Sequence, residues 1–281
     1  MKTKTKIVVG ILGYGEIGSA IVRICRNAGV KVLIKELVYD QIKDNKIDYL
    51  HVNIPEKDNQ EFINIVADNI NKIKPSLTII NSSVTPGTTR KIFELTHLPI
   101  VHSPVIGLHP YLYKSIKYYF PKIIGPVNEE SKKLALKHFS NLGLKVKNFD
   151  SAENSEVSKL LDLVYYAWNI IFCKWVKELS TKLNLNFDQV YIGHNMIYNK
   201  GYKKLLPNVI RPIFYPGKGP IGGHCTIPDT ILFDKFLPNR FTKFVLNENN
   251  RYKKEVKDIE KEREIFLKTQ RTFIAEKIKN S

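Results

Sequence analysis

An apolar strand that runs directly into a glycine-rich turn is the feature that most constrains the fold of this chain. The strand covers residues 6–12, and the turn over 13–18 has the spacing Gly-x-Gly-x-x-Gly. An amphipathic helix over 16–27 follows, and a second strand over 30–34 leads to Glu36, eighteen residues past the last glycine of the turn. This order of strand, turn, helix, strand and acidic residue predicts the first βαβ unit of a dinucleotide-binding sheet.

Each glycine of the turn has a separate task in such a unit. Gly13 permits the tight turn, Gly15 lets a pyrophosphate approach the backbone and the helix dipole, and Gly18 lets helix and strand pack closely. Glu36 is placed to accept hydrogen bonds from the adenosine ribose and to repel a 2′-phosphate, which favours NAD over NADP, although the neighbouring Lys35 opposes that preference. The predicted cofactor-binding residues are Gly13, Tyr14, Gly15, Glu16, Ile17, Gly18, Glu36 and Ser83.

Strand and helix patterns continue to alternate after this unit. Strands are expected over 48–53, 77–81, 99–102, 122–125 and 145–149, and helices over 57–73, after Pro86 and over 129–142. Later helices are expected over 152–183 and 184–206, from beyond Asp229 to about residue 236, and over 247–279. The side chains expected to be buried in the last helix are Ile259, Ile265, Phe266 and Phe273.

This alternation predicts an α/β fold. A Rossmann-type doubly wound parallel sheet is followed by a smaller all-α domain built on a long helix. We expect an NAD-binding domain over 1–150 and a helical substrate and dimerisation domain over 151–281.

A second unusual stretch, over 216–229, concentrates four glycines around one cysteine. Glycine and proline at this density indicate a loop whose backbone approaches a ligand closely. Apolar spacing resumes after it, so we expect Cys225 at or just before a helix N-terminus, where the dipole lowers a thiol pKa. Asp229 follows one helical turn later. The alternative is a buried cysteine without chemistry.

This loop resembles the active-site loop of the UDP-glucose/GDP-mannose dehydrogenase family, which reads Gly-x-Gly-x-Gly-Gly-x-Cys with an aspartate four residues later. Here it reads Gly217-Lys-Gly-Pro-Ile-Gly-Gly-His-Cys225-Thr-Ile-Pro-Asp229, with one residue more between the glycine pairs. Two further stretches are similar to family motifs: Asn81-Ser-Ser83-Val-Thr-Pro-Gly-Thr-Thr89 and the helix that carries Glu156 and Lys159.

The resemblance implies catalytic roles for Cys225, Lys159, Asp229 and Ser83. In the family, the cysteine attacks an aldehyde intermediate and the lysine is catalytic. Asp229 would support the cysteine, and Ser83 would donate its hydroxyl near the nicotinamide or a bound water.

The chain departs from the family pattern at three places. Val105 stands where the family has a catalytic glutamate, and Leu163 stands where it has an asparagine that would stabilise an oxyanion. His102 and His109 flank the first of these positions and either compensate for it or are structural. Residues 230–281 are too few for the family's second Rossmann-like domain, so we expect a short, divergent member without the domain that grips the nucleotide of a sugar nucleotide.

The net charge and the cysteine content limit the classes of partner and the cellular location expected for this chain. The formal net charge of +17 comes from 44 Lys and Arg against 27 Asp and Glu. The basic residues are scattered and accompany no nucleic-acid motif, which disfavours a nucleic-acid partner and agrees with steering of an anionic substrate. Three cysteines without metal-ligand spacing indicate free thiols, no metal site and a cytoplasmic location, and no signal peptide or membrane span is expected.

These patterns predict an NAD-dependent oxidoreductase acting on the CH–OH group of a small molecule that is anionic or sugar-derived. The resemblance implies that the alcohol would be oxidised through an aldehyde and a Cys225 thioester to an acid. One alternative is a single-hydride hydroxy-acid dehydrogenase that uses Lys159. The other is a catalytically inactive nucleotide-binding regulatory or assembly subunit. We expect a homodimer that buries apolar residues of the 152–183 helix.

Overall fold

A computed structural model of the chain describes residues 7–254. The chain divides into two compact units, Met1–Leu160 and Leu161–Ser281, and the division falls within the long helix α6 (Ala152–Lys182). The predicted helix over 247–279, with Ile259, Ile265, Phe266 and Phe273, lies largely outside the described residues.

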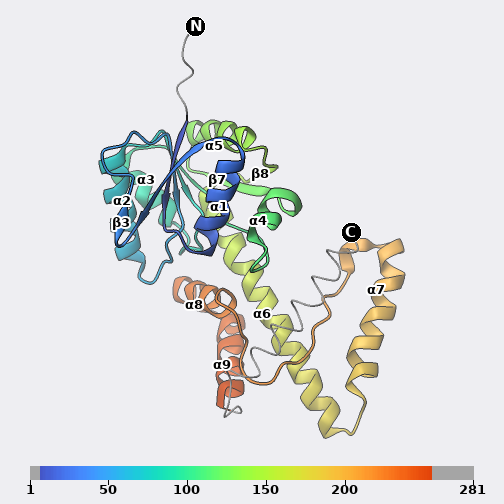
Figure 1. Cartoon of the computed structure of the whole chain (residues 1–281). Coiled ribbons are helices and arrows are strands. Elements are labelled where there is room, and N and C mark those ends of the chain that lie inside the picture. The colour runs from blue at the N-terminus through green and yellow to red at the C-terminus, as the bar shows by residue number, and fades with distance from the viewer. Residues whose placement is uncertain (1–6, 255–281) are drawn as a thin grey trace. The chain divides into compact units, whose positions relative to one another are not determined.

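The first unit is built on one eight-stranded sheet with the order β3-β2-β1-β4-β5-β6-β7-β8 (Figure 1). The strands are β1 (Val8–Leu12), β2 (Lys31–Glu36), β3 (Tyr39–Asp40), β4 (Tyr49–Val52), β5 (Leu77–Ile80), β6 (Ile100–His102), β7 (Lys122–Pro126) and β8 (Val146–Asn148). Strands β2, β1, β4, β5 and β6 are mutually parallel, which confirms the Rossmann-type α/β fold.

Two strand features were not predicted. β3 pairs antiparallel with β2, and β7 pairs antiparallel with β6 and carries β8 parallel to itself. Because β7 runs in reverse, its first residue, Lys122, lies at the edge of the sheet where the parallel strands end. This edge is where open α/β sheets bind ligands.

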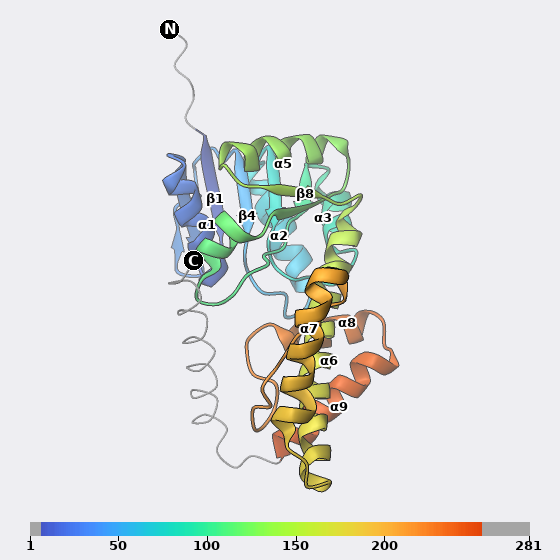
Figure 2. The same ribbon diagram turned by 90° about the vertical axis from the view of Figure 1, so that its right-hand side faces the viewer.

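Helices cover both faces of the sheet (Figures 1 and 2). On one face, Val9 and Ile11 pack with buried side chains of α1 (Glu16–Asn27) and α5 (Glu129–Asn141). On the other face, Leu12 and Leu50 pack with buried side chains of α2 (Asn59–Ile73) and α3 (Thr88–Thr96). Alternate residues of β1 therefore serve two separate cores, as expected for a strand buried on both sides.

The segment between β6 and β7 holds two short elements that the sequence did not predict. They are α4 (Leu112–Lys114) and a π-helical turn over Ser115–Tyr119. Leu112 and Ile116 bury themselves in the α1 and α5 core, so this segment is packed onto the domain.

The second unit contains only helices and loops among its described residues. The later part of α6 is followed by a π-helical turn (Asp188–Gly193), α7 (His194–Leu205), α8 (Thr226–Phe236) and α9 (Arg240–Lys254). The predicted helix over 184–206 therefore begins as a π-helical turn and becomes α-helical only at His194. Within residues 7–254, no helix is both long and apolar enough to cross a membrane.

Candidate functional site

The glycine-rich turn has the geometry that a dinucleotide requires. Gly13 has a φ of +92°, and a Cβ on Gly18 would lie 2.1 Å from the Gly13 carbonyl oxygen. A Cβ on Gly15 would meet nothing within 4 Å, so the backbone there faces open space at the start of α1. The two closely packed glycines shape the turn and the open one leaves room for a phosphate.

A cavity of about 650 Å³ lies on the β2 side of this turn. Gly13, Gly15 and Glu36 line it together with Lys35 and Leu37. The Glu36 carboxylate accepts a hydrogen bond from the Tyr14 backbone N–H, and it therefore lies against the turn. Lys35 forms a 2.7 Å ion pair with Asp40 across the β2–β3 pair. The Glu36 carboxylate is thus the group that contacts the glycine turn, whereas the Lys35 ammonium is paired with Asp40. These residues fit the adenosine half of a nicotinamide dinucleotide.

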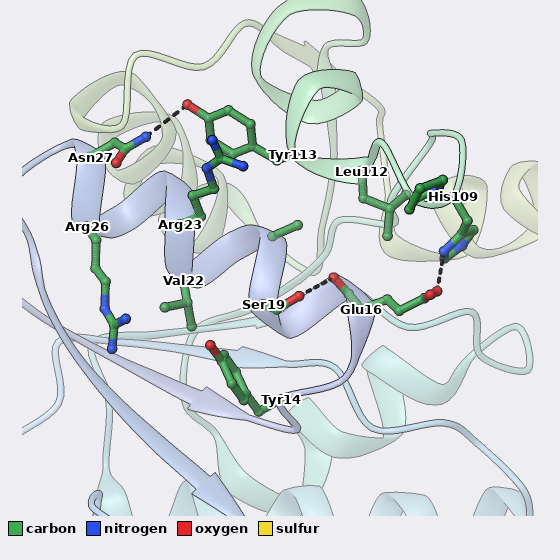
Figure 3. A pocket seen from close by; sticks show the side chains of 12 residues that line it. Tyr14, Glu16, Ser19, Val22, Arg23, Arg26, Asn27, His109, Leu112 and Tyr113 are labelled. Carbon is green, nitrogen blue, oxygen red and sulfur yellow. Dashed lines mark hydrogen bonds and ion pairs between the residues drawn. The ribbon is translucent and has the colours of Figure 1, made fainter. Parts of the chain in front are cut away.

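A second cavity, of about 530 Å³, lies along the solvent side of α1 (Figure 3). His109 Nδ1 contacts the Glu16 carboxylate, and this contact links the segment after β6 to the glycine turn. Further along the helix, Arg23 stacks 4.1 Å from the centre of the Tyr113 ring. Asn27 donates a 2.9 Å hydrogen bond to the Tyr113 hydroxyl. His109 therefore contacts the turn through Glu16 in this structure.

The loop after β5 carries Ser83, as predicted, at the carboxyl edge of the sheet. Glu156, in the first turns of α6, fixes the end of this loop. Its carboxylate accepts hydrogen bonds from the Gly87 N–H at 2.7 Å, the Thr89 N–H at 2.9 Å and the Thr89 hydroxyl at 2.6 Å. Glu156 thus caps the N-terminus of α3. Burial raises its pKa to about 7, although these hydrogen bonds favour the charged form.

Lys159 follows Glu156 by three residues on α6 and is half-buried. It acts electrostatically on His102, at the end of β6, and on Lys122, at the start of β7. The structure therefore brings Lys159 to the strand ends at the carboxyl edge. Ser83, Lys159 and the glycine turn all belong to the first unit.

His102 is a buried structural residue in this arrangement. It is 0% exposed, its Nε2 donates to the Ser82 carbonyl at 3.1 Å, and its Nδ1 accepts from the Ser155 hydroxyl at 2.8 Å. Burial lowers its pKa to about 3, so it stays neutral near pH 7 and cannot replace a charged glutamate. Val105 is buried in the α1 and α5 core.

A pair of buried histidines lies next to this edge. The Asn81 side-chain amide is 3.0 Å from His51 Nδ1 and 3.1 Å from Asn53 Oδ1. Since the amide donates to both, His51 Nδ1 must accept, and its Nε2 carries the proton that it donates to His138 Nε2 at 2.9 Å. Burial lowers the pKa of His138 to about 3 and that of His51 well below its usual value. The pair is therefore neutral, and each tautomer follows from its partners.

Cys225 and Asp229 lie together in the second unit. Cys225 immediately precedes α8, which confirms its expected position at a helix N-terminus, and the Asp229 N–H donates to the Cys225 carbonyl at 2.9 Å. Asp229 is buried, whereas Cys225 is partly exposed. Cys25 and Cys173 are buried, which raises their pKa to about 12 and about 11. Cys225 is thus the one thiol of the three that a reagent can reach.

Two residues that the sequence did not single out hold the Cys225 loop. The Lys174 ammonium, on α6, donates to the carbonyls of Gly217 and Gly219, the latter at 2.7 Å. Asn249, on α9, accepts the Ile221 N–H at 2.6 Å. A lysine within the nearly apolar run over 160–176 was the available signal for the first of these. The loop backbone is therefore held at Gly217 and Gly219 and at Ile221, just before the second glycine pair.

Comparison with solved structures places this fold among dehydrogenases. A UDP-D-ManNAc dehydrogenase from Pyrococcus horikoshii matches with a TM-score of 0.70 at 18% identity, over 88% of this chain and 69% of that chain. A UDP-glucose dehydrogenase from Pyrobaculum islandicum matches with a TM-score of 0.71 at 16% identity, over 89% and 69%. A 3-hydroxyisobutyrate dehydrogenase from Mycobacterium tuberculosis matches with a TM-score of 0.65 at 14% identity, over 88% and 94%.

At these identities the likeness is one of fold. No protein-family model matches the sequence, and no curated protein matches it. The chain therefore has a dehydrogenase-like fold.

Proposed function

We propose that the chain is an NAD-dependent dehydrogenase that oxidises the CH–OH group of an anionic or sugar-derived small molecule. The glycine turn carries this proposal. Gly13, the open Gly15 and the Glu36 carboxylate border a cavity of about 650 Å³, and Gly18 packs closely against the Gly13 carbonyl oxygen. This arrangement suits a dinucleotide without a 2′-phosphate. NAD bound there would supply the hydride acceptor.

Lys159 and Ser83 are the proposed groups for the first oxidation. As the hydride leaves the alcohol carbon, negative charge develops on the substrate oxygen. The Lys159 ammonium would stabilise that charge, and the Ser83 hydroxyl would orient the reacting group. Both residues belong to the same unit as the glycine turn, which supports their assignment.

Cys225 is the proposed nucleophile for a second oxidation. Its thiolate would add to the aldehyde carbon, and the resulting thiohemiacetal would release a second hydride to form a thioester that water cleaves. Its partial exposure and its position at the start of α8 support a reactive thiol. The buried Asp229 carboxylate, one turn later, would position the loop or the attacking water.

A simpler reaction has one observation in its favour. The structure aligns over 94% of the Mycobacterium tuberculosis 3-hydroxyisobutyrate dehydrogenase. In this second candidate function, Lys159 serves a single hydride transfer on a hydroxy acid and Cys225 is not used. The buried Val105, which has no charge to offer the chemistry, agrees with it.

Product stoichiometry separates these possibilities. A screen of anionic and sugar-derived alcohols with NAD should yield NADH, and Lys159→Ala should slow it by about a hundredfold or more. With covalent catalysis, wild type forms two NADH and an acid for each substrate, and Cys225→Ser stops after one. One NADH in both proteins at the same rate would eliminate covalent catalysis. Tight NAD binding without turnover would favour the regulatory subunit.

We further propose that the protein is a homodimer joined through α6. Exposed apolar side chains on this helix follow a spacing of four and three residues, which places them on one face. They are Leu161 (44% exposed), Tyr165 (60%), Trp168 (38%), Phe172 (41%), Trp175 (50%) and Leu179 (37%). A second copy of the same helix offers the matching stripe, and a C2 contact would bury both.

Mass measurement tests the dimer. Light scattering at micromolar protein should give about twice the chain mass of 32.4 kDa. Phe172→Glu, in the centre of the stripe, should give monomers, whereas Phe236→Glu, an equally exposed change on α8, should not. A monomeric wild type would reject the proposal.

A further inference from the structure

Lys122 is an unusual residue for a sheet. It is 2% exposed, and in residues 7–254 it forms no ion pair. Its Nζ instead donates to three uncharged acceptors, which are Asn81 Oδ1 at 3.2 Å, the Ser103 carbonyl and the Pro104 carbonyl at 3.0 Å. Burying an unpaired charge is costly, so an amine in such a place needs an explanation.

The three acceptors come from two separate segments of the carboxyl edge. Asn81 directly follows β5 and precedes Ser83, whereas Ser103 and Pro104 directly follow β6. The reversed direction of β7 brings the Lys122 amine between them. One side chain therefore ties together the two segments that border the proposed substrate site.

We infer that Lys122 is a positioning residue of the proposed active site, which fixes the segments after β5 and β6 and places a buried positive charge beneath the expected nicotinamide. The inference rests on the proposed dehydrogenase function for its second half. Its first half, the fixing of the two segments, stands on the hydrogen bonds alone.

Protonation decides how well Lys122 performs this task. Burial, and then the charge of Lys159, lower its pKa to about 7. The protonated amine has three N–H groups and satisfies all three acceptors, whereas the neutral amine has two and leaves one acceptor unpaired. The other titratable groups that interact with it electrostatically are Lys159, His51 and His102. Both histidines stay neutral from pH 6 to pH 9, since their pKa values lie lower.

Amide hydrogen exchange of the full chain, resolved by peptide, tests the positioning. At pH 6, residues 81–88 and 103–110 should exchange at least about threefold faster in Lys122→Met than in wild type. Lys133→Met, an exposed lysine on α5, serves as the control and should behave as wild type. Wild type at pH 9, corrected for intrinsic rates, should show part of the same acceleration without any substitution.

Two exchange results would overturn the positioning role. One is unchanged exchange in both segments. The other is an equal acceleration in β1 and β4, because that would mean a general loss of stability and no local task. If Lys122→Met fails to fold, the wild-type comparison between pH 6 and pH 9 still decides the matter in residues 103–110, because Glu156, whose pKa is also about 7, is hydrogen-bonded to Gly87 and Thr89 at the end of the other segment.

The relative affinity for NAD⁺ and NADH tests whether Lys122 places a positive charge near the nicotinamide. NAD⁺ carries a positive nicotinamide and NADH does not, so a protonated Lys122 beneath the ring should weaken NAD⁺ more. The ratio of the Kd for NAD⁺ to that for NADH should fall at least about threefold from pH 6 to pH 9 in wild type and stay constant in Lys122→Met. Binding of both nucleotides with a pH-independent ratio in wild type would refute the charge effect. Binding of neither would reject the proposed function and the charge effect together, while the exchange result still decides the positioning.

Discussion

Replacing His102 by glutamine should make the protein less sensitive to acid. His102 has a pKa of about 3 in the folded chain against 6.5 ordinarily. As the pH falls from 6.5 towards 3, His102 is therefore protonated in the unfolded state and stays neutral in the folded state. The free energy of unfolding decreases over this range. Between pH 7 and pH 5 this loss is about 2 kcal/mol for one such histidine. His138, with the same shift, adds about as much again.

Glu156 changes the pH dependence of stability in the opposite direction to His102. Its pKa is raised from 4.5 to about 7, so the folded state holds the proton more tightly and stability rises by about 2 kcal/mol from pH 7 to pH 5. The wild-type profile is the sum of these effects. Only the difference between wild type and His102→Gln isolates the histidine, because glutamine keeps a donor and an acceptor but does not titrate.

Urea unfolding at pH 7 and pH 5 measures this difference. Far-UV circular dichroism is the suitable signal, since the two tryptophans, Trp168 and Trp175, both belong to the second unit and His102 belongs to the first. We expect the stability lost on going to pH 5 to be about 2 kcal/mol smaller in His102→Gln than in wild type. His97→Asn, at an exposed position, should leave the loss unchanged. Equal losses in wild type and His102→Gln would refute the reasoning.

Four other experiments test the two sites. Gly18→Ala should destabilise the fold by roughly 1–3 kcal/mol, because its Cβ meets a carbonyl oxygen at 2.1 Å. Gly15→Ala should fold normally yet bind NAD at least about tenfold more weakly in calorimetry, and normal binding would contradict the assigned pyrophosphate position. Wild type should bind NAD at least about tenfold more tightly than NADP, and equal affinities would contradict the role of Glu36. Iodoacetamide should alkylate Cys225 before the other cysteines, and Lys174→Met should change that rate by freeing the loop; modification of a buried cysteine first would contradict the structure.

The parts of the fold that local patterns encode were predicted from the sequence. Apolar runs located the strands, the Gly-x-Gly-x-x-Gly turn located the first βαβ unit, and an uninterrupted helical pattern over 152–183 located α6. Strand direction was not accessible, because an apolar run reads the same for a parallel and an antiparallel strand. The reversal of β7, and with it the place of Lys122, therefore emerged only from the structure.

The buried polar residues were the hardest to predict. Lysine is usually a surface residue, so nothing in the sequence marked Lys122 as buried, and the one signal for Lys174 was its place within the nearly apolar run over 160–176. In the sequence, Glu156 stands out only as part of a motif similar to the family's, whereas its hydrogen bonds to Gly87 and Thr89 show that it caps a helix. His102, considered as a substitute for a missing glutamate, is held neutral by burial. In each case the deciding quantity is the desolvation of a side chain, which depends on the packed fold.

The short outer strands of the sheet have a consequence for self-association. An exposed strand with many unpaired backbone groups is a template for strands of other molecules and for fibre growth. Here the sheet ends in β3, with two residues, and in β8, with three. Asp40 in β3 and Lys147 in β8 add charge at these borders. An incoming strand would gain only a few hydrogen bonds there, so the sheet is protected from lateral aggregation even when the protein is concentrated.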